Sequence, residues 1–356
     1  MPNGMLKAAK KLTLMGARGV GAYSALKGSK WRTERLLILG YHGISLQDEA
    51  EWRPGLFMTP DIFEQRMETL AKLGCTVLPL DEAITRLQER SLPPLSVVIT
   101  FDDGFHNFFT AAFPVMKRYK FPATVYQTTF YSEWNEPIFN LMCPYLLWKA
   151  AGKVIEYQDL IGKPGSFDLR TEEGRKTASA EILGFARSNG FSREQKQDLL
   201  RRVADALGLN YQEISDQRVF TLMSGDELSQ MVQGGIDIEL HTHRHRVPKE
   251  KHLFMKELAD NQNFLAQIGA PRATHFTYPC GVYREELFPW LAEFGVRSAT
   301  TCDSGLVDSR LNLMQLPRFV DTPGVSHLEF EAWVCGLRQF LPGRATAQLG
   351  KDGVLL

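Results

Sequence analysis

Short apolar runs alternate along the chain with stretches whose apolar residues recur at helical spacing. The runs are typical of strands buried on both faces of a parallel sheet, and they cover residues 36–42, 75–78, 95–101, 123–126, 236–240, 275–278, 298–302 and 314–320. The stretches between them predict helices over residues 60–73, 81–90, 114–119 and 253–268. This alternation predicts an α/β fold, in which crossover helices connect the strands of a parallel sheet.

The strand–helix alternation is interrupted over residues 132–222, which are polar and predict mostly helix. A helix is predicted over residues 171–188, and Ser192 with Gln195 forms a capping box that opens another over residues 193–207. We interpret residues 132–222 as a helical insertion over the end of the sheet. It either shapes a substrate groove or adds packing; a further helix, opened by Ser224 and Glu227, follows it.

Two adjacent carboxylates, Asp102 and Asp103, follow the apolar run 95–101 directly. Ligand sites of parallel α/β sheets lie beyond the carboxyl ends of the strands, where these side chains are expected. Neighbouring carboxylates repel each other, and burial penalises their charged form, so the pair is costly unless a function uses it. The alternative is an Asp-Asp-Gly turn whose carboxylates cap local amides.

Histidines follow a second predicted strand, 236–240. His241 and His245 are four residues apart, a spacing that lets one turn aim both imidazoles at one point. Imidazole is the commonest metal ligand in proteins, although the basic residues that follow also fit a solvated loop. With one carboxylate, the two histidines would form a metal site with open positions, as zinc hydrolases require. His275 lies within a predicted strand and is expected to be structural.

Five motifs, in order along residues 36–322, resemble those of the polysaccharide deacetylases (NodB homology domain, carbohydrate esterase family four). They are residues 41–44, 100–104, 241–245, 276–281 and 316–318. The resemblance implies a distorted (β/α) barrel that carries the helical insertion. It also implies a metal-dependent hydrolase, holding Zn²⁺ or another divalent transition metal, that removes acetyl groups from N-acetylated sugars of a polysaccharide or lipid-linked glycan.

The resemblance also assigns roles to individual residues. Asp103, His241 and His245 are implied as metal ligands and Asp102 as the general base. The backbone N–H of Cys280 takes the place of the oxyanion donor, and Tyr278 of the same motif is expected beside the substrate.

Two positions depart from the family pattern. Many members carry an arginine, paired with the base, where this chain has Thr277. We hypothesise that Arg318 supplies this guanidinium from the last strand. The late histidine that protonates the leaving amine has no clear match, and His42 and His327 are the candidates for that role.

Two other functions use the same residues. Two histidines and a carboxylate also form the facial triad of iron(II) oxygenases, although the adjacent Asp102 and the parallel β-α pattern fit hydrolysis better. A non-catalytic glycan-binding module with a degenerate site is the other alternative. The intact set of Asp102, Asp103, His241 and His245 weighs against it.

Composition limits the partners and the compartment. The chain has 41 Lys and Arg against 41 Asp and Glu, so its overall charge gives no reason to expect nucleic acid. Its five cysteines are scattered, which suits reduced thiols in the cytoplasm better than a disulfide framework. No apolar run is long enough to span a bilayer.

The two ends of the chain differ from the domain expected over residues 36–340. Residues 1–35 are basic, with apolar residues interleaved, and we interpret them as an amphipathic segment lying on an anionic membrane surface. This would make the protein peripheral at the inner membrane; the alternative is a solvated arm or a helix packed on the barrel. Residues 341–356 are expected to close over the barrel without chemistry.

Overall fold

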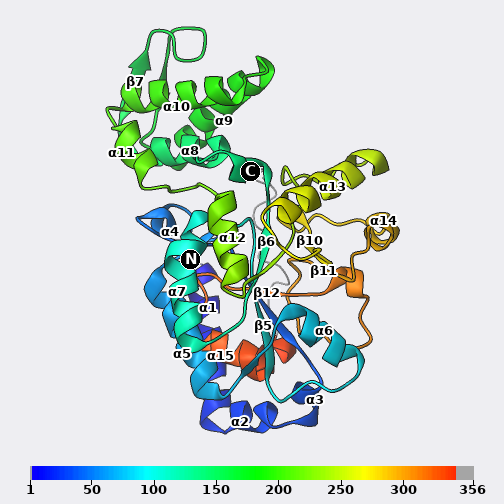
Figure 1. Ribbon diagram of the computed structural model, residues 1–356. Helices are drawn as coiled ribbons and strands as arrows, with labels where there is room; N and C mark the ends of the chain where they lie inside the picture. Colours follow the sequence, from blue (N-terminus) through cyan, green and yellow to red (C-terminus); the bar gives the residue numbers. More distant parts are fainter. Residues whose placement is uncertain (1, 342–356) are drawn as a thin grey trace.

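A parallel sheet of eight strands forms the centre of the computed structural model, which describes residues 2–341 and their side chains from residue 11 onward. The strands run in the order β11-β10-β9-β6-β5-β1-β12, and β4 pairs with the start of β5. A parallel bridge between Thr300 and Leu316 connects the two edges and curls the sheet into a barrel (Figure 1). The strands are β1 Leu37–Tyr41, β4 Thr76–Val77, β5 Ser96–Phe101, β6 Thr124–Gln127, β9 Asp237–Leu240, β10 His275–Thr277, β11 Ser298–Thr300 and β12 Phe319–Val320.

Helices surround the sheet in the positions that crossover connections require. They are α5 Pro60–Leu73, α6 Leu80–Gln88, α7 Phe113–Tyr119, α12 Gly225–Gln233, α13 Lys251–Gln267, α14 Leu287–Phe294 and α15 His327–Cys335. Several ends follow the sequence signals: α5 has Pro60 at its first turn and ends at Gly74, with a left-handed φ of 71°. The predicted α/β barrel is confirmed.

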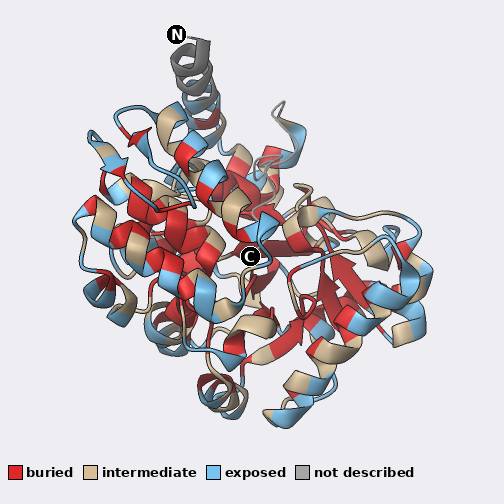
Figure 2. Ribbon diagram, turned by 90° about the horizontal axis from the view of Figure 1, so that it is seen from above, coloured by how far each residue is buried: buried red, intermediate tan, exposed pale blue. Residues whose placement is uncertain are grey.

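Alternate residues of the strands face two different cores, as the two-residue period of a strand dictates. Leu39 and Ile99 belong to the larger core, between the sheet and the surrounding helices. Ile38 and Val98 belong to a smaller core inside the barrel. Buried strand residues therefore appear red throughout the barrel in Figure 2.

Residues 132–222 hold helices and also a β-hairpin that the sequence did not predict. The elements are η2 Phe130–Glu133, α8 Phe139–Lys149, β7 Val154–Tyr157, β8 Gly165–Asp168, α9 Glu172–Ser188, α10 Arg193–Leu207 and α11 Tyr211–Asp216. The antiparallel β7–β8 pair has two exposed residues, Val154 and Glu156, on its first strand, so its apolar alternation is weak. These elements share a core of their own, which reaches the barrel through Phe57 and Phe105. They rise above the barrel in Figure 1.

The N-terminal helices pack against the end of the described chain. These elements are α1 Pro2–Gly19, α2 Ala22–Lys27, α3 Lys30–Thr33 and η5 Leu337–Phe340. Leu14 and Tyr23 form a small core with Ala332 and Cys335 of α15, so one side of this segment packs on the barrel. No helix in the described part of the chain combines the length and the apolar character that crossing a membrane requires. The expectation for residues 341–356 falls, from residue 342 on, outside the described residues.

Short elements complete the described chain. They are β2 Gly43–Ile44, α4 Glu49–Trp52, β3 Phe57–Met58, η1 Phe108–Ala112, η3 Pro279–Gly281 and η4 Leu313–Gln315. The five cysteines form no disulfide.

Candidate metal site at the barrel mouth

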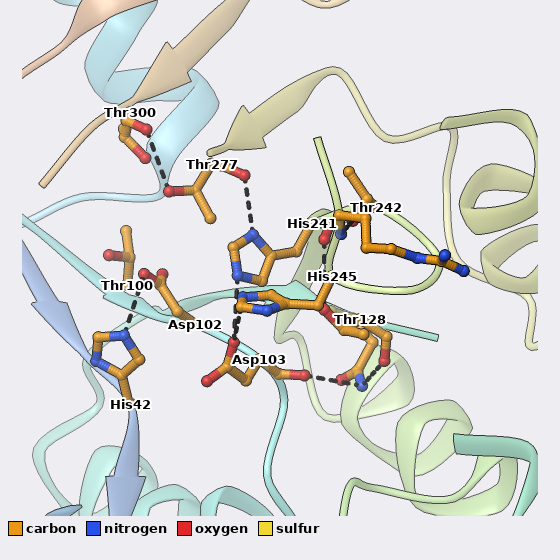
Figure 3. A network of polar contacts seen from close by, with 12 residues as sticks. His42, Thr100, Asp102, Asp103, Thr128, His241, Thr242, His245, Thr277 and Thr300 are labelled. Carbon is orange, nitrogen blue, oxygen red and sulfur yellow. Dashed lines mark hydrogen bonds and ion pairs between the residues drawn. The ribbon is translucent and has the colours of Figure 1, made fainter. Parts of the chain in front are cut away.

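Asp103, His241 and His245 meet at the mouth of the barrel, the edge at which the carboxyl ends of β5 and β9 lie. Asp103 Oδ1 lies 3.2 Å from His241 Nε2 and 3.3 Å from His245 Nε2. All three side chains are buried, and Figure 3 shows both imidazoles turned toward the carboxylate. Among the described residues, this is the one cluster of His, Cys, Asp and Glu whose ligand atoms could hold a metal ion together.

The hydrogen bond of His241 fixes which of its nitrogens carries the proton. Nδ1 lies 2.8 Å from the carbonyl oxygen of Thr277, and a carbonyl only accepts, so Nδ1 must donate. In a neutral imidazole, Nε2 then directs a lone pair at Asp103 Oδ1, which itself accepts no hydrogen bond. Two facing lone pairs at this distance repel unless a cation lies between them. The donor set, two imidazole nitrogens and a carboxylate oxygen, fits Zn²⁺ or a similar divalent ion.

The protonation states of the ligands agree with this interpretation. Burial lowers the pKa of His245 to about 4, so its imidazole is neutral at pH 7 and can act as a ligand. Burial alone would raise the pKa of Asp103. Positive charge beside the carboxylate, such as that of protonated imidazoles, outweighs this effect and lowers its pKa; with both imidazoles neutral, a bound cation would have to supply that charge.

A left-handed turn aims Asp103 into the site. Asp103 and Gly104 have φ values of 70° and 81°, a conformation that Gly adopts without strain. A Cβ at Gly104 would overlap the side-chain amide of Gln127. That amide donates to the Asp103 carbonyl oxygen (3.3 Å), as does the backbone N–H of Thr128 (3.2 Å). Hydrogen bonds from the end of β6 therefore fix the conformation of this turn.

Helix α13 holds the histidine loop in a similar way. The backbone N–H of His241 donates to Asn261 Oδ1 (3.0 Å), and the Asn261 amide donates to the carbonyl oxygen of Gln127 (3.0 Å). The Glu257 carboxylate accepts from the backbone N–H of Arg244 (2.7 Å). Asn261 is fully buried and thus connects both halves of the site.

Within the loop itself, the Thr242 hydroxyl accepts from the backbone N–H of Arg246 (3.0 Å). Thr242 therefore orients the loop.

Sequence reasoning missed Gln127, Glu257 and Asn261. Asn261 left a usable signal, because it falls between Phe254, Leu258 and Leu265 on the apolar face of a helix. A polar residue at such a position needs a buried partner.

The structure places Arg318 against Asp102. Its guanidinium donates to both carboxylate oxygens at 2.7 Å and also reaches the Thr301 carbonyl oxygen and the Thr100 hydroxyl. Burial would raise the pKa of Asp102, but the charge of Arg318 outweighs this effect and lowers it. The hydroxyl of Thr277, at the position where many members have arginine, instead donates to the Thr300 carbonyl oxygen.

Of the two candidate acids, the structure brings only His42 to the site. His42 Nε2 lies 3.8 Å from Asp102 Oδ2, and both side chains are buried; they are neighbours in Figure 3. His327 begins α15, is half exposed and lies 3.3 Å from Glu331 Oε1, its i+4 neighbour on that helix.

Cys280 and Tyr278 lie in the third motif but face different surroundings. Cys280 has a left-handed φ of 56°, and burial together with the charge of Asp103 raises the pKa of its thiol to about 12. The ring of Tyr278 packs in the larger core and its hydroxyl donates to the Met314 carbonyl oxygen (2.8 Å). Its described contacts are thus those of a packing residue, and the expectation that it lies beside the substrate gains no support from them.

Comparison with known proteins assigns the family. The polysaccharide deacetylase family model matches residues 89–149 and 200–299, on either side of most of the insertion. A Bacillus subtilis relative named as a polysaccharide deacetylase, YxkH, is 22% identical over 86% of this chain and 80% of its own length. The Escherichia coli poly-β-1,6-N-acetyl-D-glucosamine N-deacetylase is 27% identical over 28% of this chain and 15% of its own length.

Solved structures show the same fold. The Streptococcus pyogenes deacetylase PplD, in complex with acetate, has a TM-score of 0.56 at 18% identity, covering 86% of this chain and 99% of its own. IcaB from Ammonifex degensii has a TM-score of 0.54 at 18% identity, covering 85% of this chain and 97% of its own.

The chain belongs to the polysaccharide deacetylase family. It is therefore classed as a deacetylase enzyme, which favours hydrolysis over the oxygenase and binding-module alternatives.

Proposed function

We propose that the protein is a metal-dependent hydrolase that removes acetyl groups from N-acetylated sugars of a polysaccharide. The observation that carries the proposal is the convergence of His241 Nε2 and His245 Nε2 on Asp103 Oδ1, an acceptor with no hydrogen bond. These three residues would hold Zn²⁺ or a similar ion. Such an ion supplies Lewis-acid polarisation of the acetyl carbonyl and a water of lowered pKa.

Asp102 is the proposed general base. Arg318 keeps it ionised and fixes its plane, while each carboxylate oxygen retains a lone pair beyond the one that binds the guanidinium. This pairing lowers the basicity of Asp102, so the pKa of the attacking water must also be lowered if a proton is to move. The arrangement thus supports the need for a bound cation.

His42 is the proposed acid for the leaving amine. An amine leaves an amide only when its nitrogen is protonated, and His42 is the candidate that lies beside Asp102. The backbone N–H of Cys280 is the proposed donor to the developing oxyanion.

The first experiment measures acetate release from β-1,6- and β-1,4-linked N-acetylglucosamine oligomers by the zinc-loaded protein. We expect release that a chelator abolishes, that Asp102→Asn abolishes, and that continues when oxygen is excluded. Release by the chelated protein would contradict the metal role, and release that requires oxygen would favour the oxygenase alternative. Stoichiometric zinc without release from either oligomer would contradict the substrate class.

Two histidine variants test the acid. We expect His42→Gln to lower the rate about 100-fold and His327→Gln, a matched change at a half-exposed histidine, to leave it unchanged. The opposite ranking would assign the acid to His327.

A further inference from the structure

The N-terminal segment, residues 11–35, carries apolar side chains that are mostly exposed to solvent. Val20 is 84% exposed, Leu12 69% and Met15 53%. The first two are the most exposed large apolar side chains in the described part of the chain. Leu14 and Tyr23, by contrast, are buried against α15. The segment therefore has one face that packs on the barrel and another that remains uncovered.

A further exposed aromatic residue lies on η5, which packs against α2. Phe340 is 57% exposed and its ring lies 4.6 Å from that of Trp31. The Arg35 guanidinium lies over the Trp31 ring, 4.5 Å from its centre. Aromatic rings beside basic groups are typical of residues at a membrane–water boundary.

The charge of the chain is divided between this segment and the rest. Residues 1–35 hold eight Lys and Arg against one Glu, a net charge of +7. The remaining residues hold 33 Lys and Arg against 40 Asp and Glu, a net charge of −7. An anionic surface would therefore attract this segment and repel the rest of the chain. The protein would approach such a surface with this segment first.

The arginines and the lysines of the segment do different things. Arg32 is buried, and Arg18 and Arg35 form ion pairs with Glu331 and Asp308 of the body. These arginines attach the segment to the barrel. Lys11 and Lys30 are exposed, although Lys30 also lies 3.6 Å from Glu34. The outward charge is thus carried by Lys11 and Lys30 and in part by Arg18, whose side chain is 56% exposed.

We infer that the exposed residues Leu12, Met15, Val20 and Phe340, with the neighbouring lysines, bind the surface of an anionic phospholipid bilayer. Apolar side chains enter the boundary region, while the lysines stay at the level of the lipid phosphates. The inference does not depend on the proposed activity.

The inferred attachment leaves the barrel mouth open. Helix α3 ends at Thr33, just before β1 begins at Leu37, whereas Asp102 and Asp103 follow the other end of the parallel neighbour β5. In Figure 1, α2 and α3 accordingly lie at the opposite end of the molecule from the insertion. A bilayer that contacts α2 and α3 would leave the mouth facing water, where a glycan chain can reach it.

The test is co-sedimentation of the full chain with vesicles of phosphatidylcholine, with and without 30% phosphatidylglycerol. We expect binding to the anionic vesicles alone, and weaker binding as salt rises. The variant Leu12→Ser/Met15→Ser/Val20→Ser should bind at least tenfold more weakly. Each of Lys11→Gln and Lys30→Gln should cost about fivefold.

A matched control replaces three exposed apolar residues elsewhere, Val154, Leu253 and Leu311, by Ser. It should bind vesicles as the unaltered protein does, and both triple variants should keep the native circular dichroism spectrum. Equal loss in the two triple variants, or no binding to anionic vesicles, would overturn the inference. So would a concentration-dependent dimer that only the Leu12/Met15/Val20 variant dissociates, because the face would then bind a second copy.

Discussion

Two groups of carboxylates and histidines lie inside the same barrel, and only one of them has the properties of a metal site. Asp237, Glu239 and His241 are alternate residues of one strand and its end, so they face the interior at successive heights. At the mouth, His241 points at an acceptor that has no donor. Deeper in the barrel, the carboxylates of Asp237 and Glu239 each accept a hydrogen bond from a protein donor.

The deeper group is satisfied by the protein alone. Glu239 accepts from the backbone N–H groups of Thr274 and His275 (2.8 and 2.6 Å), and Asp237 accepts from the Thr124 hydroxyl (3.0 Å). His275 contacts Ser298 Oγ through Nδ1 and Asp81 Oδ1 through Nε2. His275 is thus a structural residue, as its place within a strand suggested.

The pKa directions of the carboxylates separate the two groups as well. Burial raises the pKa of Asp237 to about 6 and that of Glu239 well above its usual value. At the mouth, the Arg318 guanidinium lowers the pKa of Asp102, and positive charge beside His241 and His245 would lower that of Asp103, although both carboxylates are buried more deeply than Asp237. The lesson is that residue type does not identify the site; the direction of lone pairs and the balance of charge do.

The largest expected effect comes from exchanging one carboxylate in each group for its amide. Asp103→Asn removes a charged ligand and should reduce acetate release at least 1,000-fold, whereas Glu239→Gln keeps a neutral side chain and should change it little. Initial rates at saturating zinc measure both. Comparable losses in the two variants would remove the functional distinction between mouth and interior.

Arg318→Met should cost the most stability, because it leaves the Asp102 carboxylate buried without its partner. We expect the free energy of unfolding to fall by about 3–5 kcal/mol. Arg118→Met, which breaks an exposed pair with Glu64, should cost at most about 1 kcal/mol. Urea denaturation measures the free energy of unfolding of both variants. Equal losses would show that the buried pair contributes no more to stability than the exposed one.

A feature of the fold or of the site could be predicted when the residues that determine it are close together in the sequence. The strands, the capping boxes and the residues directly after β5 and β9 follow from local pattern, and the missing guanidinium pointed to Arg318. Gln127 and Asn261 could not be assigned, because their partners lie far away along the chain and only the fold brings them together. The β7–β8 hairpin was missed because its alternation is weak and its first strand is exposed.

Asn261→Leu tests such a distant contact. The change keeps the residue buried but removes the acceptor for the His241 backbone N–H, so the histidine loop loses its anchor. We expect zinc affinity to fall about 10- to 100-fold with the fold retained. Calorimetric zinc titration measures it, with Asn140→Leu, on α8 of the insertion, as control. Unchanged affinity would mean that the loop is positioned without α13.

The smallest effect is a pH dependence that belongs to the deeper group. The pKa of Asp237 is about 6 in the fold and 3.8 ordinarily, so its protonated form stabilises the fold below pH 4. This stabilisation is lost as pH rises through 6. Relative to Asp237→Asn, the unaltered protein should lose about 1–3 kcal/mol of unfolding free energy between pH 4 and 7. Parallel stability curves for the two proteins would contradict the raised pKa.

The central claim, that the mouth and not the interior holds the metal, is tested most directly by titrating zinc into chelator-treated protein. We expect one equivalent to bind to the unaltered chain and to His275→Gln, and binding to be lost in His245→Gln. One equivalent retained in His245→Gln, or lost in His275→Gln, would contradict the account and place the ion elsewhere.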